Sequence, residues 1–232
     1  MKASNLLIFG AGGALGSAIG AHLLGQGYTL HTAGGSTLPG AASHLPLSYD
    51  HPLEASSFSS LPSLEVVVWA QGLNCSDTVA SFEAADLQCL LQGNVLFIAS
   101  SLQSLLAAGR LRTGCRLVVV SSIWQLESRP GKFSYTVSKA ALQGLVKSCA
   151  LDLGPRSIVI NAVLPGVVDT PMTRAHLSPE KIDAITAQTA LGRLPQPTDI
   201  AEAVGFLASP ANRVITGQFL TVDAGFIGLK HA

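Results

Sequence analysis

The amino-acid sequence predicts an α/β fold, in which one doubly wound and mostly parallel sheet carries helices on both faces. Three observations support this prediction. Short apolar runs of strand length alternate with segments of helical periodicity along the chain. The runs at 66–70 and 117–122 are apolar almost throughout, as is typical of parallel strands buried on both faces. A glycine cluster, GAGGALG at 10–16, lies between the first strand and the first helix.

The expected elements follow each other in regular order. Strands are expected at 5–9, 28–32, 45–48, 66–70, 117–122, 157–166 and 218–222. Helices are expected directly after the glycine cluster, at 81–106, at 135–153 before a Gly-Pro stop, and at 199–208 after a Thr-Asp cap.

Two segments depart from this alternation. Residues 36–63 are rich in Ser, Pro, Ala and His, so besides the strand at 45–48 we expect only a short helix at 53–58 and a truncated second crossover helix. Residues 170–195 are polar and contain three prolines, and we expect them to form a mobile substrate lid over 171–195.

The composition is that of one globular domain over residues 1–232. The chain is 48% hydrophobic and only 12% charged, so it can build a large core. Its formal net charge is zero and it has no run of like charges, which argues against a nucleic-acid-binding protein. We see no internal repeat, heptad array or linker.

The four cysteines are widely spaced and form no CxxC motif, and three of them lie in apolar segments. This pattern predicts buried free thiols in a reducing compartment, hence a cytoplasmic protein, and neither a disulfide framework nor a metal site. The apolar stretch 6–24 superficially resembles a signal peptide or a membrane span. Its five glycines are better explained by a phosphate-binding turn, so we expect no membrane association.

The glycine cluster has the strand–turn–helix setting of a Rossmann-type dinucleotide site. Glycines let the backbone approach a pyrophosphate closely, and the N–H groups and dipole at the helix start favour its negative charge. NAD-binding folds usually place an acidic residue after the second strand, but residues 33–37 read Ala-Gly-Gly-Ser-Thr. Backbone N–H groups and hydroxyls at 35–37 can form a small anion nest. The sequence therefore favours NADP(H) over NAD(H).

Tyr135 and Lys139 lie four residues apart at the start of a predicted helix, which places both on one face. A phenol with an ordinary pKa of about 10 is a poor acid or base at neutral pH, and a neighbouring cation lowers that pKa. The pair can therefore serve as an acid/base. The alternative is a surface helix that carries both residues by chance.

At these residues the chain resembles the short-chain dehydrogenase/reductase family, in the compact subgroup of the 3-oxoacyl-carrier-protein reductases. The resemblance covers essentially the whole length. The matching motifs are GAGGALG at 10–16, Asn94, Ser122, the YxxxK motif formed by Tyr135 and Lys139, NAVLPGVVDTPM at 161–172 and the segment 191–226.

The resemblance implies a catalytic set of four residues, Asn94, Ser122, Tyr135 and Lys139. Tyr135 is expected to be the general acid in reduction and the base in oxidation, and Ser122 to bond the same substrate oxygen. Lys139 is expected to lower the tyrosine pKa and to hold the nicotinamide ribose. Asn94 is expected to place a water that connects Lys139 to solvent.

The resemblance also implies the residues that hold the cofactor, with the Thr170 hydroxyl and the Val168 backbone taking the nicotinamide carboxamide. Besides Tyr135 and Lys139, the cofactor-binding set is expected to be Gly10, Gly12, Gly13, Leu15, Gly16, Gly34, Gly35, Ser36, Asp50, Ala70, Gln71, Gly72, Pro165, Gly166, Val168 and Thr170.

The chain departs from the family pattern at three positions. Phe9 replaces the leading threonine of the glycine motif, Trp69 replaces the first asparagine of the NNAG segment, and Ala14 replaces a glycine. We expect Phe9 and Trp69 to exchange a polar contact for apolar packing, and Ala14 to add a methyl group beside the pyrophosphate.

The resulting functional hypothesis is an NAD(P)-dependent oxidoreductase, most simply an NADPH-dependent ketone reductase. The alternative is a catalytically silent nucleotide sensor or scaffold with the same fold. Helical segments 87–106 and 140–151 are apolar on more than one face, which predicts a homodimer or homotetramer. The small-molecule carbonyl or alcohol substrate stays open among acyl thioesters, steroids, sugars and aromatic ketones. Charged residues near the pocket, Arg129, Lys132, Arg174 and His176, are expected to be solvated.

Overall fold

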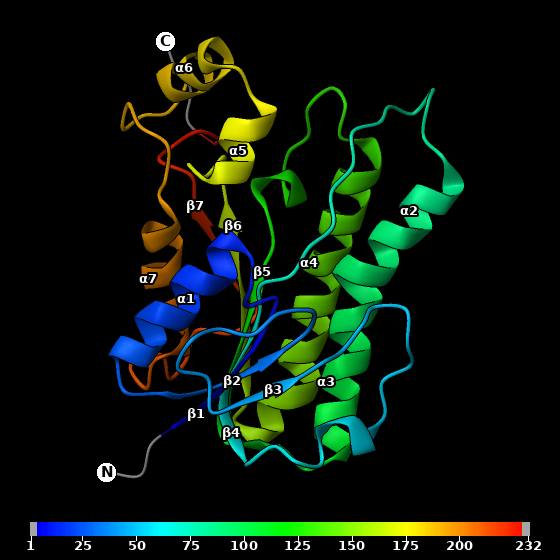
Figure 1. The fold of residues 1–232 in the computed structure, drawn as a ribbon, viewed down its shortest axis with the longest axis vertical. Coiled ribbons are helices and arrows are strands. Elements are labelled where there is room, and N and C mark those ends of the chain that lie inside the picture. Colours follow the sequence, from blue (N-terminus) through cyan, green and yellow to red (C-terminus); the bar gives the residue numbers. More distant parts are fainter. Residues whose placement is uncertain (1–3, 229–232) are drawn as a thin grey trace.

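In the computed structural model, which describes residues 4–228, seven parallel strands form one sheet (Figure 1). The strand order is β3-β2-β1-β4-β5-β6-β7. Their bounds are β1 Asn5–Phe9, β2 Thr29–Ala33, β3 Ser43–Leu45, β4 Leu64–Trp69, β5 Leu111–Val120, β6 Val159–Pro165 and β7 Phe219–Val222. The order reverses between β1 and β4, and in such sheets a ligand binds beyond the carboxyl ends of the strands at this point. The predicted fold class is confirmed.

Helices cover both faces of the sheet. Their bounds are α1 Ala14–Gly25, α2 Ala84–Leu91, α3 Phe97–Ala107, α4 Phe133–Leu153, α5 Pro171–His176, α6 Pro179–Ala187 and α7 Pro197–Ala208. Helices α1 and α7 lie together on one face, and α2, α3 and α4 lie on the other (Figure 1). Helices α5 and α6 lie beyond one end of the sheet, above α7 (Figure 1).

Strand β4 shows why the sheet strands are apolar throughout. Val67 and Trp69 point into the core on the α3/α4 side, whereas Val66 and Val68 point into the core on the α1/α7 side. All four side chains are buried. Because successive side chains alternate between faces, a strand between two helical layers has no polar side.

The β2–β4 crossover is short, as expected. Between β3 and β4 there is only the 3-10 turn η1 Ala55–Phe58, within the predicted 53–58. Strand β3 covers 43–45 instead of the predicted 45–48, because His31 and Thr32 of β2 pair with Ser43 and His44. The His31 Nδ1 also bonds the Ser43 hydroxyl at 2.8 Å, which fixes this register.

The predicted helix at 81–106 is interrupted. Its middle, η2 Gln92–Leu96, is a π-helical turn between α2 and α3. The combined stretch Ala84–Ala107 is long and apolar enough to cross a membrane, judged by length and composition. Half of its most apolar window is buried inside the structure, as in a core helix, so this is weak evidence for a membrane span.

Some boundaries and local features differ from the sequence prediction. Strand β5 ends at Val120, so Ser122 lies beyond the strand. Helix α7 begins at Pro197. Asp199 lies in its first turn, where its carboxylate accepts a hydrogen bond from the Gln196 backbone N–H at 2.7 Å. Of the four free cysteines, only Cys115 is fully buried, so the prediction of buried thiols is wrong for the others.

The predicted lid region is partly helical. Helices α5 and α6 occupy much of 171–195, the segment predicted to be a mobile substrate lid. Pro171 and Pro179 stand in the first turns of these helices, where a missing N–H breaks no intrahelical bond. These prolines therefore start helices.

Candidate active site

The glycine cluster forms a tight turn between β1 and α1, and three of its glycines have no room for a side chain. A Cβ on Gly10, where φ is +76°, would lie 2.6 Å from the Gln71 backbone nitrogen. A Cβ on Gly12 would lie 2.6 Å from the Ser36 Cβ, and one on Gly16 would collide with the Gly10 carbonyl oxygen. The turn thus brings together β1, the loop after β4 and the loop after β2.

The N-terminus of α1 opens onto this turn. Its N-cap, Gly13, is extended, and within the described residues no side chain caps the helix. Gly12, Gly13 and Ala14 are exposed, while Leu15 is half-buried. Ala14 is the first residue of the helix. Its methyl group is exposed and does not crowd the glycine contacts given above. Free N–H groups and the helix dipole make this end suited to a phosphate.

Gln71, in the loop after β4, carries a buried amide that the chain itself does not satisfy. Neither Oε1 nor Nε2 has a hydrogen-bond partner in the part of the chain that the structure describes. Leaving such a group unpaired costs about 1–3 kcal/mol, so it calls for a partner outside the chain. Next to it, the Ala70 backbone N–H donates to the Phe9 carbonyl at 2.9 Å and ties this loop to β1.

Asn94 and Lys139 both lie beside Gly72. Asn94 lies in the π-helical turn η2, where its Oδ1 accepts from the Leu73 N–H at 2.7 Å. Its Nδ2 donates to the Leu73 carbonyl at 2.9 Å and to the Ser138 hydroxyl at 3.0 Å. A Cβ on Gly72 would lie 3.3 Å from the Lys139 Nζ and 3.6 Å from the Asn94 Oδ1. Sequence reasoning missed Ser138, although it shares a helix face with Tyr135.

Lys139 is an almost fully buried cation, with 3% of its surface exposed. Burial lowers its pKa to about 8, so most molecules still carry the proton at neutral pH. Its Nζ lies 5.7 Å from the centroid of the Tyr135 ring. The expected placement of the two side chains on one face of α4 is therefore confirmed.

Burial raises the pKa of Tyr135, and the Ser122 hydroxyl partly offsets this rise. Desolvation of the phenol is the largest effect and sets the direction of this shift, and the expected lowering by Lys139 stays a prediction. Ser122 lies just before the 3-10 turn η3 Ile123–Gln125, and its Oγ accepts from the Trp124 N–H at 3.2 Å. A raised pKa keeps the phenol protonated at neutral pH, as a proton donor requires.

The residues after β6 lie at the same sheet edge. Pro165 ends β6, and the Gly166 N–H donates to the Val222 carbonyl of the β7 strand at 3.0 Å. A Cβ on Gly166 would lie 2.7 Å from the Cβ of Asp223, so this turn also requires glycine. Val168 is buried behind it.

The Thr170 hydroxyl makes local hydrogen bonds at the start of α5. It caps α5 by accepting from the Thr173 N–H at 3.2 Å, and it lies 3.0 Å from the Thr173 hydroxyl. The Thr173 hydroxyl in turn donates to the Val168 carbonyl at 2.6 Å. In this structure the Thr170 side chain therefore anchors α5 at the site.

At the end of β2, Gly34 adopts φ +124° and its N–H donates to the Leu45 carbonyl at 3.0 Å. Gly35 and Ser36 are exposed, with Ser36 against Gly12 of the glycine turn. A hydroxyl pair, Thr32 and Thr37, spans this loop at 3.0 Å. The predicted anion nest at 35–37 is thus exposed to solvent and lies next to the glycine turn.

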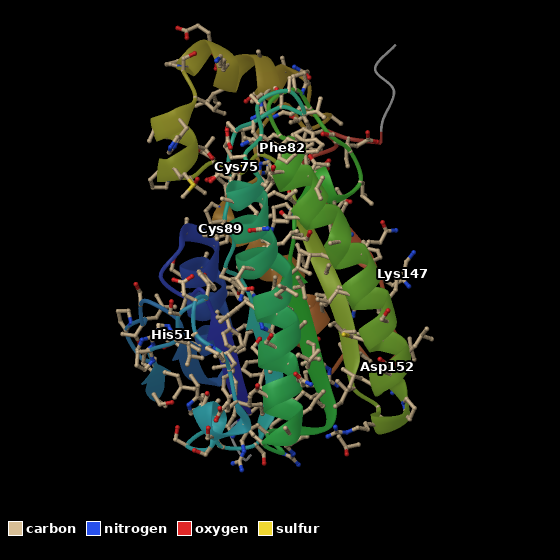
Figure 2. All side chains as sticks on the ribbon, turned by 90° about the vertical axis from the view of Figure 1, so that its right-hand side faces the viewer. His51, Cys75, Phe82, Cys89, Lys147 and Asp152 are labelled. Atoms are coloured by element: carbon tan, nitrogen blue, oxygen red, sulfur yellow. The ribbon has the colours of Figure 1, made fainter. Side chains whose placement is uncertain are left out.

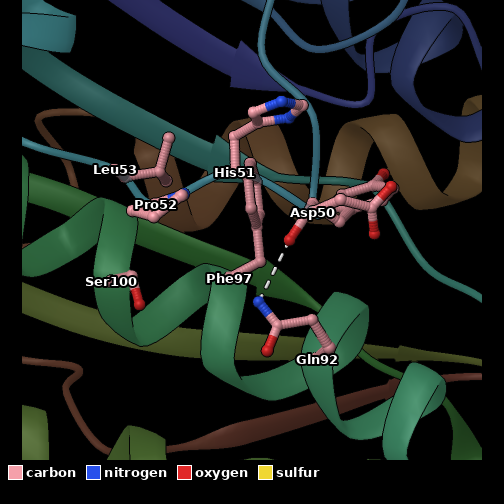
Figure 3. A pocket seen from close by; sticks show the side chains of 8 residues that line it. Asp50, His51, Pro52, Leu53, Gln92, Phe97 and Ser100 are labelled. Atoms are coloured by element: carbon pink, nitrogen blue, oxygen red, sulfur yellow. Dashed lines mark hydrogen bonds between the residues drawn. The ribbon is translucent and has the colours of Figure 1, made fainter.

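Asp50 lines a separate hollow of about 370 Å³ between the loop after β3 and α3 (Figure 3). The Gln92 amide donates to the Tyr49 carbonyl at 3.0 Å across its floor. The hollow is lined by Tyr49, Asp50, His51, Pro52, Leu53, Gln92, Phe97 and Ser100. The structure therefore places Asp50 in this hollow and not among the contacts that form the glycine turn.

The residues present fit a dinucleotide. The glycine turn, the uncapped start of α1 and the unpartnered amide of Gln71 supply donors for a pyrophosphate and ribose. Asn94, Ser122, Tyr135 and Lys139 all lie beyond the carboxyl ends of the central strands, on elements packed beside this turn. Across residues 4–228, no group of three or more His, Cys, Asp or Glu side chains is arranged to hold a metal ion.

Comparison with known proteins agrees with this geometry. The family described as enoyl-(acyl carrier protein) reductase matches residues 55–227. A 3-oxoacyl-(acyl-carrier-protein) reductase of Rickettsia felis is 31% identical over 95% of both chains. L-rhamnose 1-dehydrogenase (NAD(P)(+)) of Azotobacter vinelandii is 32% identical over 85% of this chain and 78% of its own.

A cyclopentanol dehydrogenase of Comamonas is 43% identical, but the match spans less than half of either protein, 49% of this chain and 45% of the relative. Among solved structures, a short-chain dehydrogenase/reductase from Serratia marcescens aligns with a TM-score of 0.86 at 27% identity, over 96% of this chain and 97% of that one. With the site geometry, these matches show that the chain belongs to the short-chain dehydrogenase/reductase family and is similar to its 3-oxoacyl-carrier-protein reductases.

Proposed function

We propose that the protein is an NAD(P)-dependent oxidoreductase that interconverts a carbonyl compound and a secondary alcohol. The observation that carries the proposal is the buried arrangement of Tyr135 and Lys139 beside Ser122 and Asn94, at the end of an open phosphate turn. A structural helix has no reason to bury a lysine that lacks an acidic partner, because desolvation of the ammonium is unfavourable.

In reduction, Tyr135 donates its proton to the substrate oxygen while the carbonyl carbon gains a hydride. Ser122 donates a hydrogen bond to the same oxygen and fixes its direction. The hydride chemistry is supplied by the nicotinamide when it is bound. The raised pKa of Tyr135 keeps the proton available until negative charge develops on the substrate oxygen.

Lys139 would hold the ribose hydroxyls and stabilise the phenolate that remains after proton transfer. Its place beside Gly72 and the Asn94 Oδ1 supports a proton route from Lys139 towards Asn94. Because Asn94 is fixed by bonds to Leu73 and Ser138, its amide is pre-oriented for that role.

We further propose a preference for NADPH. The end of β2 offers the exposed Gly35 and Ser36 and no acidic side chain within residues 33–37, so nothing there repels a 2′-phosphate. One relative bears the name L-rhamnose 1-dehydrogenase (NAD(P)(+)), which is compatible with either cofactor. The free thiols support the proposal that the protein is located in a reducing compartment such as the cytoplasm.

We propose that helices α5 and α6 form the lid over the substrate. Helix α5 is anchored by Thr170, and the Asp169 carboxylate accepts two bonds of 2.7 Å from the Arg174 guanidinium. Both helices are mostly exposed, and Met172 in α5 is 70% exposed. An exposed apolar side chain on a short helix beside the site is suited to close over a substrate.

The test is cofactor consumption with a panel of ketones that includes an acetoacetyl thioester, a steroid, a keto sugar and an aromatic ketone. NADPH should be consumed with at least one substrate, and faster than NADH. Tyr135→Phe should lower the rate about 100- to 10,000-fold and still bind NADPH. A wild-type protein that binds the cofactor but reduces nothing would favour the silent sensor.

A further inference from the structure

Lys132, three residues before Tyr135, is buried, with only 6% of its surface exposed. It was expected among the solvated charges, and that expectation is wrong. Its Nζ donates to the Asn74 Oδ1 at 2.9 Å, the Cys75 carbonyl at 2.9 Å and the Ser76 hydroxyl at 3.2 Å. Three oxygens around the nitrogen suit the three N–H donors of an ammonium.

This lysine joins a loop to the first turn of α4. The loop residue Asp77 accepts a bond from the Ser134 N–H at 3.0 Å, and its carbonyl accepts from the Phe133 N–H at 3.3 Å. Phe82 packs on Phe133 with ring centroids 5.0 Å apart. Within the described residues, the N-cap side chain of α4 makes no capping bond, so this distant loop supplies the cap.

The same ammonium lies close to the phenol. The Lys132 Nζ is 5.6 Å from the centroid of the Tyr135 ring, and the Lys139 Nζ is 5.7 Å from it. The ring thus has two cations within the range of cation–π contacts. The three bonded loop oxygens are uncharged and hold the Lys132 cation in place, while the Asp77 carboxylate of the same loop offsets part of its charge.

We propose that Lys132 is a positioning residue for Tyr135: it fixes the first turn of α4 to loop 74–77 and keeps a positive charge beside the phenol. The inference rests on the proposed function, in which Tyr135 gives up a proton and becomes a phenolate. A cation over the ring, 5.6 Å from its centroid, favours that phenolate, and a fixed first turn keeps the phenol directed at the substrate oxygen.

Several groups face this lysine. Burial lowers the pKa of Lys132, Arg129 lowers it further, and Cys75 and Asp77 act in the opposite direction. The Ser134 backbone and side chain hold the pKa of Asp77 below its ordinary value, so Asp77 is an anion near neutral pH. Tyr135 itself is faced by Lys132, Lys139 and the Ser122 hydroxyl.

The decisive experiment measures the ionisation of Tyr135 without any substrate. The chain has only three tyrosines, so subtracting the ultraviolet pH titration of Tyr135→Phe isolates this phenol. Because burial lowers the pKa of Lys132 and raises that of Tyr135, the two titrations overlap, and in Lys132→Met the midpoint should rise relative to wild type by the share of Lys132 that still holds its proton at that pH. Lys132→Arg, which keeps the charge, should restore most of the shift.

Two further variants separate charge from packing. Lys132→Gln keeps a donor for the loop oxygens but has no charge, so it should shift the midpoint as Met does even where Met impairs folding. Lys147→Met removes an exposed lysine of the same helix, whose Nζ lies 6.0 Å from the Phe219 ring, and should shift nothing. A midpoint in Lys132→Gln equal to that of wild type would overturn the inference.

Kinetics give the second readout and distinguish this inference from the proposed function. In alcohol oxidation below the phenol pKa, Lys132→Gln should lower kcat by the factor that the measured shift gives, one pKa unit being a factor of ten, with the Kd for cofactor unchanged. If the wild-type protein shows no turnover but the Lys132 variants show the titration shift, only the proposed function is contradicted. Turnover with an unshifted titration contradicts the role of Lys132 alone.

Discussion

Burial of Lys139, at a position proposed to be catalytic, carries an energetic penalty. Its pKa of about 8 in the folded chain lies below the ordinary 10.5 of an unfolded lysine. Below pH 8 both states hold the proton, so the full penalty of burying the charge is present. Between pH 8 and 10.5 the unfolded state binds more protons, and the penalty fades as the pH rises.

Lys139→Met should therefore stabilise the cofactor-free protein at pH 7 by about 3 kcal/mol, the free energy of the pKa difference. The gap between variant and wild type should narrow as the pH approaches 10. Urea unfolding at a series of pH values measures this. A variant less stable than wild type at pH 7 would mean that Lys139 has a stabilising partner.

Phe9 and Trp69, which stand where the family pattern has polar residues, pack against each other. The two rings stack with centroids 5.7 Å apart and an angle of 3° between their planes. Trp69 is fully buried, and its Nε1 donates to the Ser101 hydroxyl at 2.9 Å. Phe9 also meets the edges of Phe58 and Phe97. An aromatic cluster thus supports the β1 and β4 ends beneath the site.

Trp69→Asn should destabilise the fold by about 3–5 kcal/mol, because it opens a cavity and strands a polar amide in this cluster. Trp69→Phe is the milder comparison, since it keeps a ring on Phe9 and loses only the bond to Ser101. Unfolding by urea gives both values. Equal stability of Trp69→Asn and wild type would disprove the packing role.

At the scale of the elements, helix α1 contains two glycines, Gly16 and Gly25, at which an added side chain is expected to have opposite effects. A Cβ on Gly16 would collide with the Gly10 carbonyl oxygen, whereas a Cβ on Gly25, in the same helix, meets nothing within 4 Å. The glycine turn therefore requires glycine at position 16, whereas position 25 has room for a side chain.

Gly16→Ala should weaken NADPH binding at least tenfold and lower stability, because the turn must move to make room. Gly25→Ala should leave binding unchanged and raise stability by up to about 1 kcal/mol through better helix propensity. Fluorescence titration of NADPH and thermal melting compare the two. Unchanged NADPH affinity in Gly16→Ala would argue that the cofactor does not contact this turn.

Sequence periodicity found most elements because strands buried on both faces and helices with one apolar stripe leave strong patterns. It missed the π-helical turn that holds Asn94, since its extra residue per turn is set by contacts to Leu73 and Ser138. It also misplaced β3, whose three residues are fixed by pairing with β2 and not by their own apolarity. Long-range pairing of this kind leaves no local signal.

For the site, the sequence predicted which residues gather but not their electrostatics. The YxxxK spacing placed Tyr135 and Lys139 on one helix face, as observed. Burial depth decided the sign of the Tyr135 shift and turned Lys132 from an expected surface charge into a buried cation. Neither burial is visible in a local pattern, because the covering atoms come from loops after β4 and β5.

At the scale of the whole molecule, one helical face keeps uncovered apolar side chains. Leu96 on η2 is 52% exposed, and Val137 and Leu151 on α4 are 39% and 80% exposed. Figure 2 shows this face, with Cys89, Lys147 and Asp152 labelled along α2 and α4. We propose that a second copy of the chain covers it, since these helices run side by side and are apolar beyond the stripe that meets the sheet.

Sedimentation velocity at micromolar concentration should show a dimer or a tetramer. Leu151→Glu places a charge on the exposed side of α4 and should shift the distribution towards monomer. Glu202→Lys, on the opposite layer in α7, is the matched surface control and should not. A wild-type monomer at this concentration would contradict the proposed assembly.

The proposed reaction transfers a hydride directly to a carbonyl carbon, and Tyr135 protonates the substrate oxygen. The most direct measurement uses NADPH that carries deuterium at the transferable position of the nicotinamide, with a reactive ketone identified from the panel. Mass spectrometry should find one deuterium on the carbinol carbon of the product with wild-type protein, and almost no product with Tyr135→Phe. Product without deuterium, or labelled product formed equally well by Tyr135→Phe, would contradict the account.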